Sequence, residues 1–480
     1  FRIWMDVKNG GQLEAKLDKS LRDFSENDPD AENPVLLIST EWEDTTLYTL
    51  GSKKTSEASS INWAIKDGVW VITFTPESLK QSIEELTNPS RNVLANQQVY
   101  QESIRFVGPS DYLIYLAAAP LNTLLKEALA TMPVQGNQAL PQTDKIIDWL
   151  ALDAFLPYVL GSKLVKEGAR TRGRFGFTRE TALSRIFFAP EIETAEIPGF
   201  LHRDINHFAS FHWHLGNGWS RLETELTSLI PQAAAGMGLA RMLASGQLGF
   251  DIKLQFLDHL DGGMIFMQTL DPQVIDEILT AAREEDLATM MKVQMEHPTG
   301  GQNYLLGLKM KNQAAIAEAM SRLLARFHPA GVPEPTLYEG KEIFYPIPET
   351  IQVGKFQQFL SYTYLDGYLL LALGDDTMIK NSIVASKNPD LQLVNSPKFT
   401  SLREKVLSAP VAIEYANGQQ QKDAVKMMQS SMRMLQAGNA DLELPDLMPL
   451  AELIDQSIST SVRRGLIYEV EGLIELTPAE

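Results

Sequence analysis

Hydrophobic residues recur along this chain with spacings that distinguish strands from helices. Apolar side chains occupy every second position from Phe1 to Val7, which predicts a strand at 2–7. Apolar residues then follow at helical spacing over 11–24, which predicts a helix. The same reasoning predicts strands at 35–40, 46–50 and 61–75, a helix at 77–86 opened by Pro76 after Thr75, and a buried strand at 111–118.

A second series of elements, in the same order, begins about 300 residues later. Both series read β-α-β-β-α-β with a short helix inserted before the last strand, the order of a split βαβ unit. After each series we expect a helical stretch (144–160 and 447–458) and a terminal strand pair (about 170–188 and 462–477). The second series comprises strands at 304–310, 342–346, 360–373 and 411–415 and helices at 313–327 and 376–386.

Turn residues repeat at a nearly constant offset. Asp67-Gly68 and Asp366-Gly367 are 366 − 67 = 299 residues apart, and each Asp-Gly pair interrupts an apolar strand pattern. A constant offset over a hundred residues predicts two copies of one structural unit. We therefore expect an α+β protein made of two tandem repeats, each with an antiparallel-rich sheet and added helices. Other matching pairs are Asn88-Pro89 with Asn388-Pro389, Leu94 with Leu393, Asn96 with Asn395, Tyr100 with Phe399, and Lys8-Asn9 with Lys311-Asn312.

The repeat divides the chain into three predicted regions. Residues 1–188 form the first repeat unit without its N-terminal leader, and residues 304–480 form the second unit. Between them, 189–303 is the strand-helix-helix leader half of the second unit, starting at a proline-containing turn over 189–198. Because Phe1 opens directly on a strand, we expect a truncated or processed form whose missing part could hold a signal peptide or anchor. Within 189–303 we expect strands at 209–215 and 263–269 and helices at 217–229, 232–245 and 272–283.

Composition narrows the possible partners. The net charge of −19 and the pI near 4.9 disfavour nucleic acid, whose phosphates require Lys and Arg, and disfavour docking on anionic lipid. The chain has no cysteine, which excludes disulfides, thiolate zinc sites and cysteine nucleophiles and is compatible with export. No apolar run approaches the roughly 18 residues of a membrane span.

Several repeated features occur in a fixed order along most of the chain. They are patterns of hydrophobic and turn residues and include no constellation of polar side chains. They are Gly249-Phe250-Asp251 with Leu257, Leu260 and Gly262, the strand, Lys-Asn and helix of 304–327, the aromatic-x-Asp-Gly strand of 364–373, Leu393-x-Asn395-x-x-x-Phe399, and the short apolar strand around Ile413.

This order resembles a bacterial domain-of-unknown-function family that has a duplicated α+β unit and occurs in predicted exported or envelope proteins. The resemblance implies an exported, periplasmic or envelope-associated location. It supplies no catalytic residue. From the sequence we therefore assign no catalytic, cofactor-binding or metal-binding residue, and we predict no cofactor.

Histidines provide the strongest candidate chemistry. His202, His207, His212 and His214 cluster, and His212 and His214 would project from the same face of a strand, as two metal ligands require. The alternation with Phe211, Trp213 and Leu215 is equally typical of a half-buried strand with a polar outer face, which is our preferred interpretation. A zinc or copper site would need a third ligand, such as His207 or a carboxylate.

Other motifs have ordinary structural interpretations. Asp258, His259 and Asp261 lie in LDHLDGG (257–263), where we expect a helix end to scatter them and the glycines to act as a C-cap. The Asp-Gly pairs are interpreted as turns with positive φ. Gly216-Asn217-Gly218 and Gly236-Met237-Gly238 lack phosphate-binding spacing and are interpreted as loop and helix-packing glycines.

Methionines are the last signal. Met is adaptable and polarisable, so Met-rich helices suit either ordinary core packing, the default interpretation, or surfaces that hold lipids or partner helices. One predicted helix carries Met427, Met428, Met432 and Met434, and another carries Met290, Met291 and Met295.

Together these patterns favour a non-enzymatic, exported binding or scaffolding protein of the bacterial cell envelope. Its partner would be a protein or an apolar small molecule or lipid, with no nucleic acid and no membrane span in this chain. One alternative is a structural subunit that self-assembles into a homo-oligomer. The other is a metal-dependent hydrolase that uses the His cluster.

Overall fold

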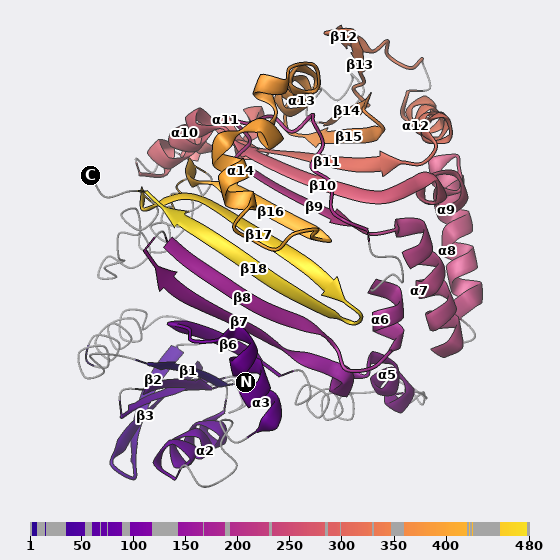
Figure 1. Ribbon diagram of the computed structural model, residues 1–480. Coiled ribbons are helices and arrows are strands. Elements are labelled where there is room, and N and C mark those ends of the chain that lie inside the picture. Colours follow the sequence, from indigo (N-terminus) through magenta and orange to yellow (C-terminus); the bar gives the residue numbers. More distant parts are fainter. Residues whose placement is uncertain are drawn as a thin grey trace. The chain divides into compact units, whose positions relative to one another are not determined.

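The computed structural model shows an α+β protein with antiparallel sheets, as the sequence predicts (Figure 1). The chain divides into two compact units, and the described residues up to Glu102 belong to the first and those from Ser103 onward to the second. The structure describes residues 2–6, 15, 35–52, 60–67, 69–73, 75–88, 97–117, 143–166, 168–187, 193–229, 233–283, 287–297, 299–328, 331–346, 360–419, 422, 425 and 452–477.

The first unit contains a five-stranded antiparallel sheet in the order β1-β5-β4-β3-β2. Helix α2 (Pro76–Thr87) buries Leu79 and Ile83 against Leu47, Ala64 and Val71 of the sheet. The strands are β1 (Arg2–Asp6), β2 (Val35–Trp42), β3 (Thr45–Ser52), β4 (Ile61–Lys66) and β5 (Val69–Thr73).

Local sequence explains two features of this unit. The side chain of Thr75 accepts a hydrogen bond from the Ser78 amide and caps α2, and Pro76 follows at the first helical position, as predicted. Asp67 has a φ of 50°, and its counterpart Asp366 has a φ of 49°, each in the two-residue turn of a hairpin. Positive φ at these positions confirms that the aspartates serve turn geometry.

The second unit is built on one eleven-stranded antiparallel sheet (Figure 1). Its strand order is β14-β15-β11-β10-β9-β16-β17-β18-β8-β7-β6. The strands are β6 (Tyr112–Leu116), β7 (Phe155–Val165), β8 (Gly168–Phe177), β9 (His207–His212), β10 (Leu260–Leu270), β11 (Gln302–Met310), β14 (Leu360–Leu365), β15 (Tyr368–Leu373), β16 (Ala412–Asn417), β17 (Ile454–Arg464) and β18 (Ile467–Leu476), with a separate hairpin of β12 (Thr336–Tyr338) and β13 (Lys341–Ile343).

Helices cover the sheet and its ends. Figure 1 shows α6, α7, α8 and α9 along one end of the strands, with α10 and α11 near the opposite end. The helices are α5 (Thr143–Leu150), α6 (Ala182–Phe187), α7 (Leu215–Leu229), α8 (Ala233–Leu248), α9 (Ile252–Gln255), α10 (Pro272–Arg283), α11 (Leu287–Glu296), α12 (Gln313–Phe327), α13 (Thr377–Lys387) and α14 (Pro397–Arg403), with short 3-10 turns at Leu152–Ala154, Leu257–His259, Pro389–Leu391 and Leu393–Asn395. Helix α3 (Gln98–Val107) contains the division between the two units, which falls after Glu102.

Two hydrophobic cores lie on opposite faces of the sheet where β15 crosses it. Leu370 joins a core with Ile379 of α13 and Phe399 of α14, whereas its neighbour Leu369 joins a core with Ile316 of α12. Because successive strand residues point to opposite faces, a strand buried on both faces has a continuous apolar sequence. The run YLLLAL of β15 is therefore uninterrupted by charge.

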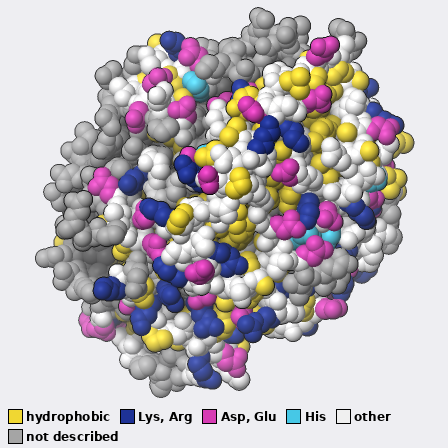
Figure 2. Space-filling model, turned by 45° about the horizontal axis from the view of Figure 1, so that its top comes forward, with side chains coloured by type: hydrophobic (Ala, Val, Ile, Leu, Met, Phe, Trp, Pro, Cys, Tyr) yellow, Lys and Arg dark blue, Asp and Glu magenta, His cyan; other side chains and the backbone are white. Residues whose placement is uncertain are grey.

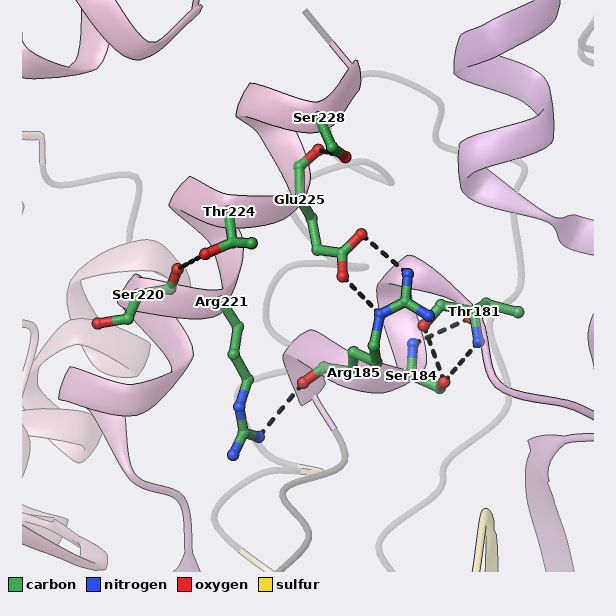
Figure 3. A network of polar contacts seen from close by, with 8 residues as sticks. All are labelled: Thr181, Ser184, Arg185, Ser220, Arg221, Thr224, Glu225 and Ser228. Carbon is green, nitrogen blue, oxygen red and sulfur yellow. Dashed lines mark hydrogen bonds and ion pairs between the residues drawn. The ribbon is translucent and has the colours of Figure 1, made fainter. Parts of the chain in front are cut away.

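Helix α6 is fixed to α7 by polar contacts that Figure 3 shows. The Thr181 hydroxyl accepts a hydrogen bond from the Ser184 amide at 3.0 Å, which caps the start of α6. The Arg185 guanidinium donates two bonds to the Glu225 carboxylate, and Arg221 donates to the Arg185 carbonyl at 3.2 Å.

Several predicted elements are corrected by the structure. The helical stretches predicted at 144–160 and 447–458 are wrong in their later parts. Helix α5 ends at Leu150, 155–165 is strand β7, and 454–464 is strand β17. The terminal strand pairs are accordingly β7 with β8 and β17 with β18, and 182–187 is a helix. The predicted buried strand at 111–118 is β6 at the edge of the sheet, with exposed Tyr112 and Leu116. Short apolar runs do not distinguish helix from strand, and pairing partners distant in sequence decide between them.

Corresponding elements of the two series also recur at a fixed offset. Strand β7 begins at Phe155 and β17 at Ile454, so 454 − 155 = 299, and β8 and β18 differ by the same 467 − 168 = 299. The duplicated unit and the division at 1–188, 189–303 and 304–480 remain predictions. Some predictions fall outside the described residues. They concern the helix at 11–24 (of which only Ala15 is described), the repeat positions Lys8, Asn9, Pro89, Leu94 and Asn96, and the methionines at 427, 428, 432 and 434.

Within the parts of the chain that the structure describes, no helix combines the length and the apolar character needed to cross a lipid bilayer.

Candidate metal centre

Three side chains converge at the end of β9. The His212 and His214 Nε2 atoms lie 3.3 Å apart. The Glu193 carboxylate places one oxygen 3.1 Å from His212 Nε2 and the other 3.5 Å from His214 Nε2. Among the described residues, these three form the group of His and acidic side chains whose ligand atoms all lie within 4.8 Å of one another.

Backbone structure brings the two imidazoles together. His212 is the last residue of β9 and lies opposite Gly263 of β10. The Trp213 amide donates to the Gly262 carbonyl at 2.7 Å, and the His214 carbonyl accepts from the Gly218 amide at 2.8 Å in the first turn of α7. The strand end and the helix start therefore fix the His212 and His214 backbones from opposite sides.

Gly262 supplies the space that the imidazoles occupy. It has a φ of +91°, and a Cβ at this position would lie 2.6 Å from His212 Nε2 and 2.8 Å from His214 Nδ1. The β10–β11 register shifts between Leu260 and Met264, so Gly262 lies in a β-bulge. Bulges are frequent beside functional sites because they redirect the chain locally.

The predicted polar outer face of this strand is wrong. His212 lies on the same strand face as Phe208 and Ser210, which are 0% and 2% exposed, and the His212 side chain is 8% exposed. The His214 side chain is 15% exposed and the Glu193 side chain 47% exposed. The two histidine side chains are thus largely shielded from solvent, and the site opens to solvent on the Glu193 side. Figure 2 shows histidine side chains reaching the surface beside acidic and basic ones.

The separations match those of a tetrahedral metal site. Zinc binds His nitrogen and carboxylate oxygen at about 2.0–2.2 Å, so two ligand atoms on one tetrahedron lie about 3.3 Å apart. The two Nε2 atoms are 3.3 Å apart, which equals that value, and the 3.1 and 3.5 Å separations join the imidazoles to the two different oxygens of the Glu193 carboxylate. Two histidines and one carboxylate form a ligand set that zinc uses in proteins, and the fourth coordination position is left for water or another ligand.

Charges around the site also favour a cation. Lys309 Nζ donates to Glu196 Oε1 at 2.5 Å and lies 3.7 Å from Asp261 Oδ2. Leaving the imidazoles out of the count, the three carboxylates of Glu193, Glu196 and Asp261 against the one ammonium of Lys309 leave 3 − 1 = 2 negative charges. Burial lowers the pKa of His212 below its ordinary value, although the neighbouring Glu193 raises it. A divalent cation would balance the local charge.

The remaining candidate residues lie elsewhere. His207 projects from the opposite face of β9, and its Nε2 atom lies 3.0 Å from the Glu414 carboxylate. The His202 backbone forms an isolated antiparallel β-bridge with Gln392. Asp258 pairs with Lys253 at 2.7 Å. The predicted C-cap in LDHLDGG is wrong, because Asp261, Gly262 and Gly263 belong to β10. The predicted scatter of the two aspartates is confirmed by their different partners, Lys253 and Lys309.

Glycine and methionine candidates give mixed outcomes. Gly216 packs closely on Asp258 at the start of α7, as a helix-packing glycine should. Gly236 and Gly238 face open space on α8, so they do not serve packing. Met291 is exposed on α11.

The sequence does not single out Glu193 as a ligand. It precedes His212 by 19 residues (212 − 193) and lies in a segment that is neither helix nor strand. The requirement for a carboxylate ligand was predictable from chemistry, but its identity depends on how the segment crosses the sheet.

Comparison with protein-family models, curated proteins and solved structures finds no match to this chain.

Proposed function

We propose that this protein binds one divalent transition-metal ion, with zinc as the best-suited metal, through Glu193, His212 and His214. The observation that carries the proposal is the convergence of two imidazole nitrogens, 3.3 Å apart, with the Glu193 carboxylate, so that one ligand atom from each residue lies within 4.8 Å of the others. The Gly262 bulge and the local excess of negative charge support it. Because the ligands include two nitrogens, zinc and its neighbours in the transition series are favoured over magnesium and calcium, which prefer oxygen.

Within this proposal the chain is a non-enzymatic binding or scaffolding protein of the bacterial envelope, exported or periplasmic. The acidic, cysteine-free composition supports an exported binding protein, and a metal ligated without thiolates suits a compartment that oxidises thiols. A protein or apolar partner and self-assembly remain proposals of the same class.

Metal-dependent hydrolysis is a second candidate function. The open fourth position and the half-exposed Glu193 favour it, since a bound water there would be activated by the metal. The two candidates differ in turnover of ester or peptide substrates, which the binding role does not require.

Zinc stoichiometry tests the proposal. After treatment with a chelator and dialysis, the full chain is titrated with zinc by calorimetry, and the metal retained after gel filtration is measured by mass spectrometry. We expect one zinc per chain, displaced by cobalt in excess and unaffected by millimolar magnesium. Retention of no zinc at micromolar free metal would contradict the proposal.

A further inference from the structure

The segment that carries Glu193 crosses one face of the large sheet. Residues 193–198, called the strap here, form neither helix nor strand. The Glu196 carbonyl accepts a hydrogen bond from Ser210 of β9 at 2.6 Å, and the Glu196 carboxylate accepts from Tyr368 of β15 at 3.1 Å. The strap therefore contacts both β9 and β15, which are separated in the sheet by β10 and β11.

The centre of the strap and its Glu193 end have different kinds of attachment. At its centre, the Ala195 amide donates to the Pro410 carbonyl at 2.7 Å, and Ala195 and Ile197 pack against the core. Glu196 is held by Lys309, whose ammonium also keeps the pKa of that carboxyl below its ordinary value. These contacts are complete within the protein.

The Glu193 end instead depends on the candidate metal centre. Its carboxylate faces His212 and His214, and its side chain is about half exposed. Without a metal the Glu193 carboxylate interacts with the two imidazoles through polar contacts alone, whereas a shared metal would add direct ligand bonds at the same atoms. Metal occupancy therefore changes the attachment of the Glu193 end of the strap and leaves that of its centre unchanged.

We propose that the bound metal acts as a clasp that regulates opening of the strap over the sheet face. This inference rests on the proposed metal-binding function. In the metal-bound protein, lifting the strap requires Glu193 to leave the metal. In the metal-free protein, the same motion breaks the hydrogen bonds, the Glu196–Lys309 ion pair and the core packing of Ala195 and Ile197 but no metal–ligand bond, so it occurs more often and uncovers the histidines.

Hydrogen exchange at the Ala195 amide measures this opening, because that amide is bonded to Pro410. Metal-free and zinc-loaded full chain are compared by mass spectrometry with residue-level fragmentation, and zinc content is measured in the same samples. At free zinc ten times Kd, linkage predicts that exchange slows by up to about tenfold. The Phe177 amide at the end of β8, bonded to the Leu466 carbonyl at 2.9 Å and without a strap residue as partner, serves as the internal control and should not change.

Two variants separate the clasp from general stabilisation. Glu193→Ala should abolish the effect of zinc on Ala195 exchange. Glu196→Gln weakens the other attachment, so exchange should be faster at every zinc concentration while zinc still slows it. One zinc bound per chain with unchanged Ala195 exchange would overturn the clasp alone. Failure to bind zinc would instead overturn the proposed function on which the clasp rests.

Discussion

Replacing His212 with alanine is expected to weaken zinc binding by on the order of 100-fold or more. Loss of a hydrogen-bonding partner behind a metal ligand already costs about 10–100-fold, so loss of a buried ligand should cost at least as much. In the proposed site His212 would supply one of three ligands, and its Nε2 atom lies 3.3 Å from His214 Nε2. Calorimetric titration of the metal-free variant measures the change directly.

His207→Ala is the matched control, because His207 belongs to the same strand but faces Glu414 on the opposite side. Its zinc affinity should equal that of the unaltered protein. Gly262→Ala offers an independent route to the same result, since its Cβ would meet both imidazoles below 3.0 Å. If zinc binds equally well to His212→Ala and to the unaltered protein, the metal lies elsewhere and the assignment of the site is wrong.

Gly168→Ala is expected to destabilise the second unit by about 3 kcal/mol or more, the range of severe backbone and packing defects. Gly168 begins β8 and pairs with Glu475 of β18, with a φ of +150°. An added Cβ would lie 1.8 Å from the Ile474 carbonyl oxygen, which is backbone and cannot move aside without separating the strands. Denaturant unfolding followed by circular dichroism measures the loss.

Gly465→Ala provides the comparison for this variant. Gly465 also has a positive φ, +62°, but a Cβ there would meet nothing within 4 Å. Its cost should therefore be the conformational preference alone, about 1–2 kcal/mol. If the two variants unfold at the same denaturant midpoint, the close contact between Gly168 of β8 and Ile474 of β18 does not determine the stability of the second unit.

The β8–β18 pairing explains why Gly168 matters so much. It is the one direct join, among the described strands, between β6-β7-β8 and the rest of the eleven-stranded sheet. Arg172 lies opposite Glu471, and these two positions are separated by the repeat offset, 471 − 172 = 299. If the predicted duplication is correct, the join pairs equivalent strands of the two copies.

Helices with a clear apolar periodicity were predictable from the sequence. The structure gives α10 and α12 the predicted bounds of 272–283 and 313–327, because each has an apolar face and a local start signal. At α12 that signal is Asn312, whose side chain accepts from the Ala315 amide. Helix formation there is decided by residues near one another in sequence.

Strand partnership was not predictable in the same way. Strand β16 pairs with β9 on one side and with β17 on the other, so it lies between segments about 200 residues upstream and about 40 residues downstream. Loop closure allows many such pairings, and apolar periodicity does not choose among them. The misassigned stretches at 155–160 and 454–458 are strands because β7 and β17, to which they belong, each pair on both sides within this sheet.

The residues of the candidate site were likewise predictable only where they are close together in sequence. His212 and His214 were recognisable because their spacing of two residues is local. Glu193 and Gly262 were not, since they reach the imidazoles only through the strap and through the β-bulge of β10.

Anomalous X-ray scattering from crystals of the full chain grown with zinc tests the central claim most directly. Data recorded on both sides of the zinc absorption edge locate the metal independently of any assumed ligand. We predict one dominant peak about 2.0–2.2 Å from both histidine Nε2 atoms and a Glu193 oxygen. A dominant peak at other residues, or none at Glu193, His212 and His214, would contradict the account.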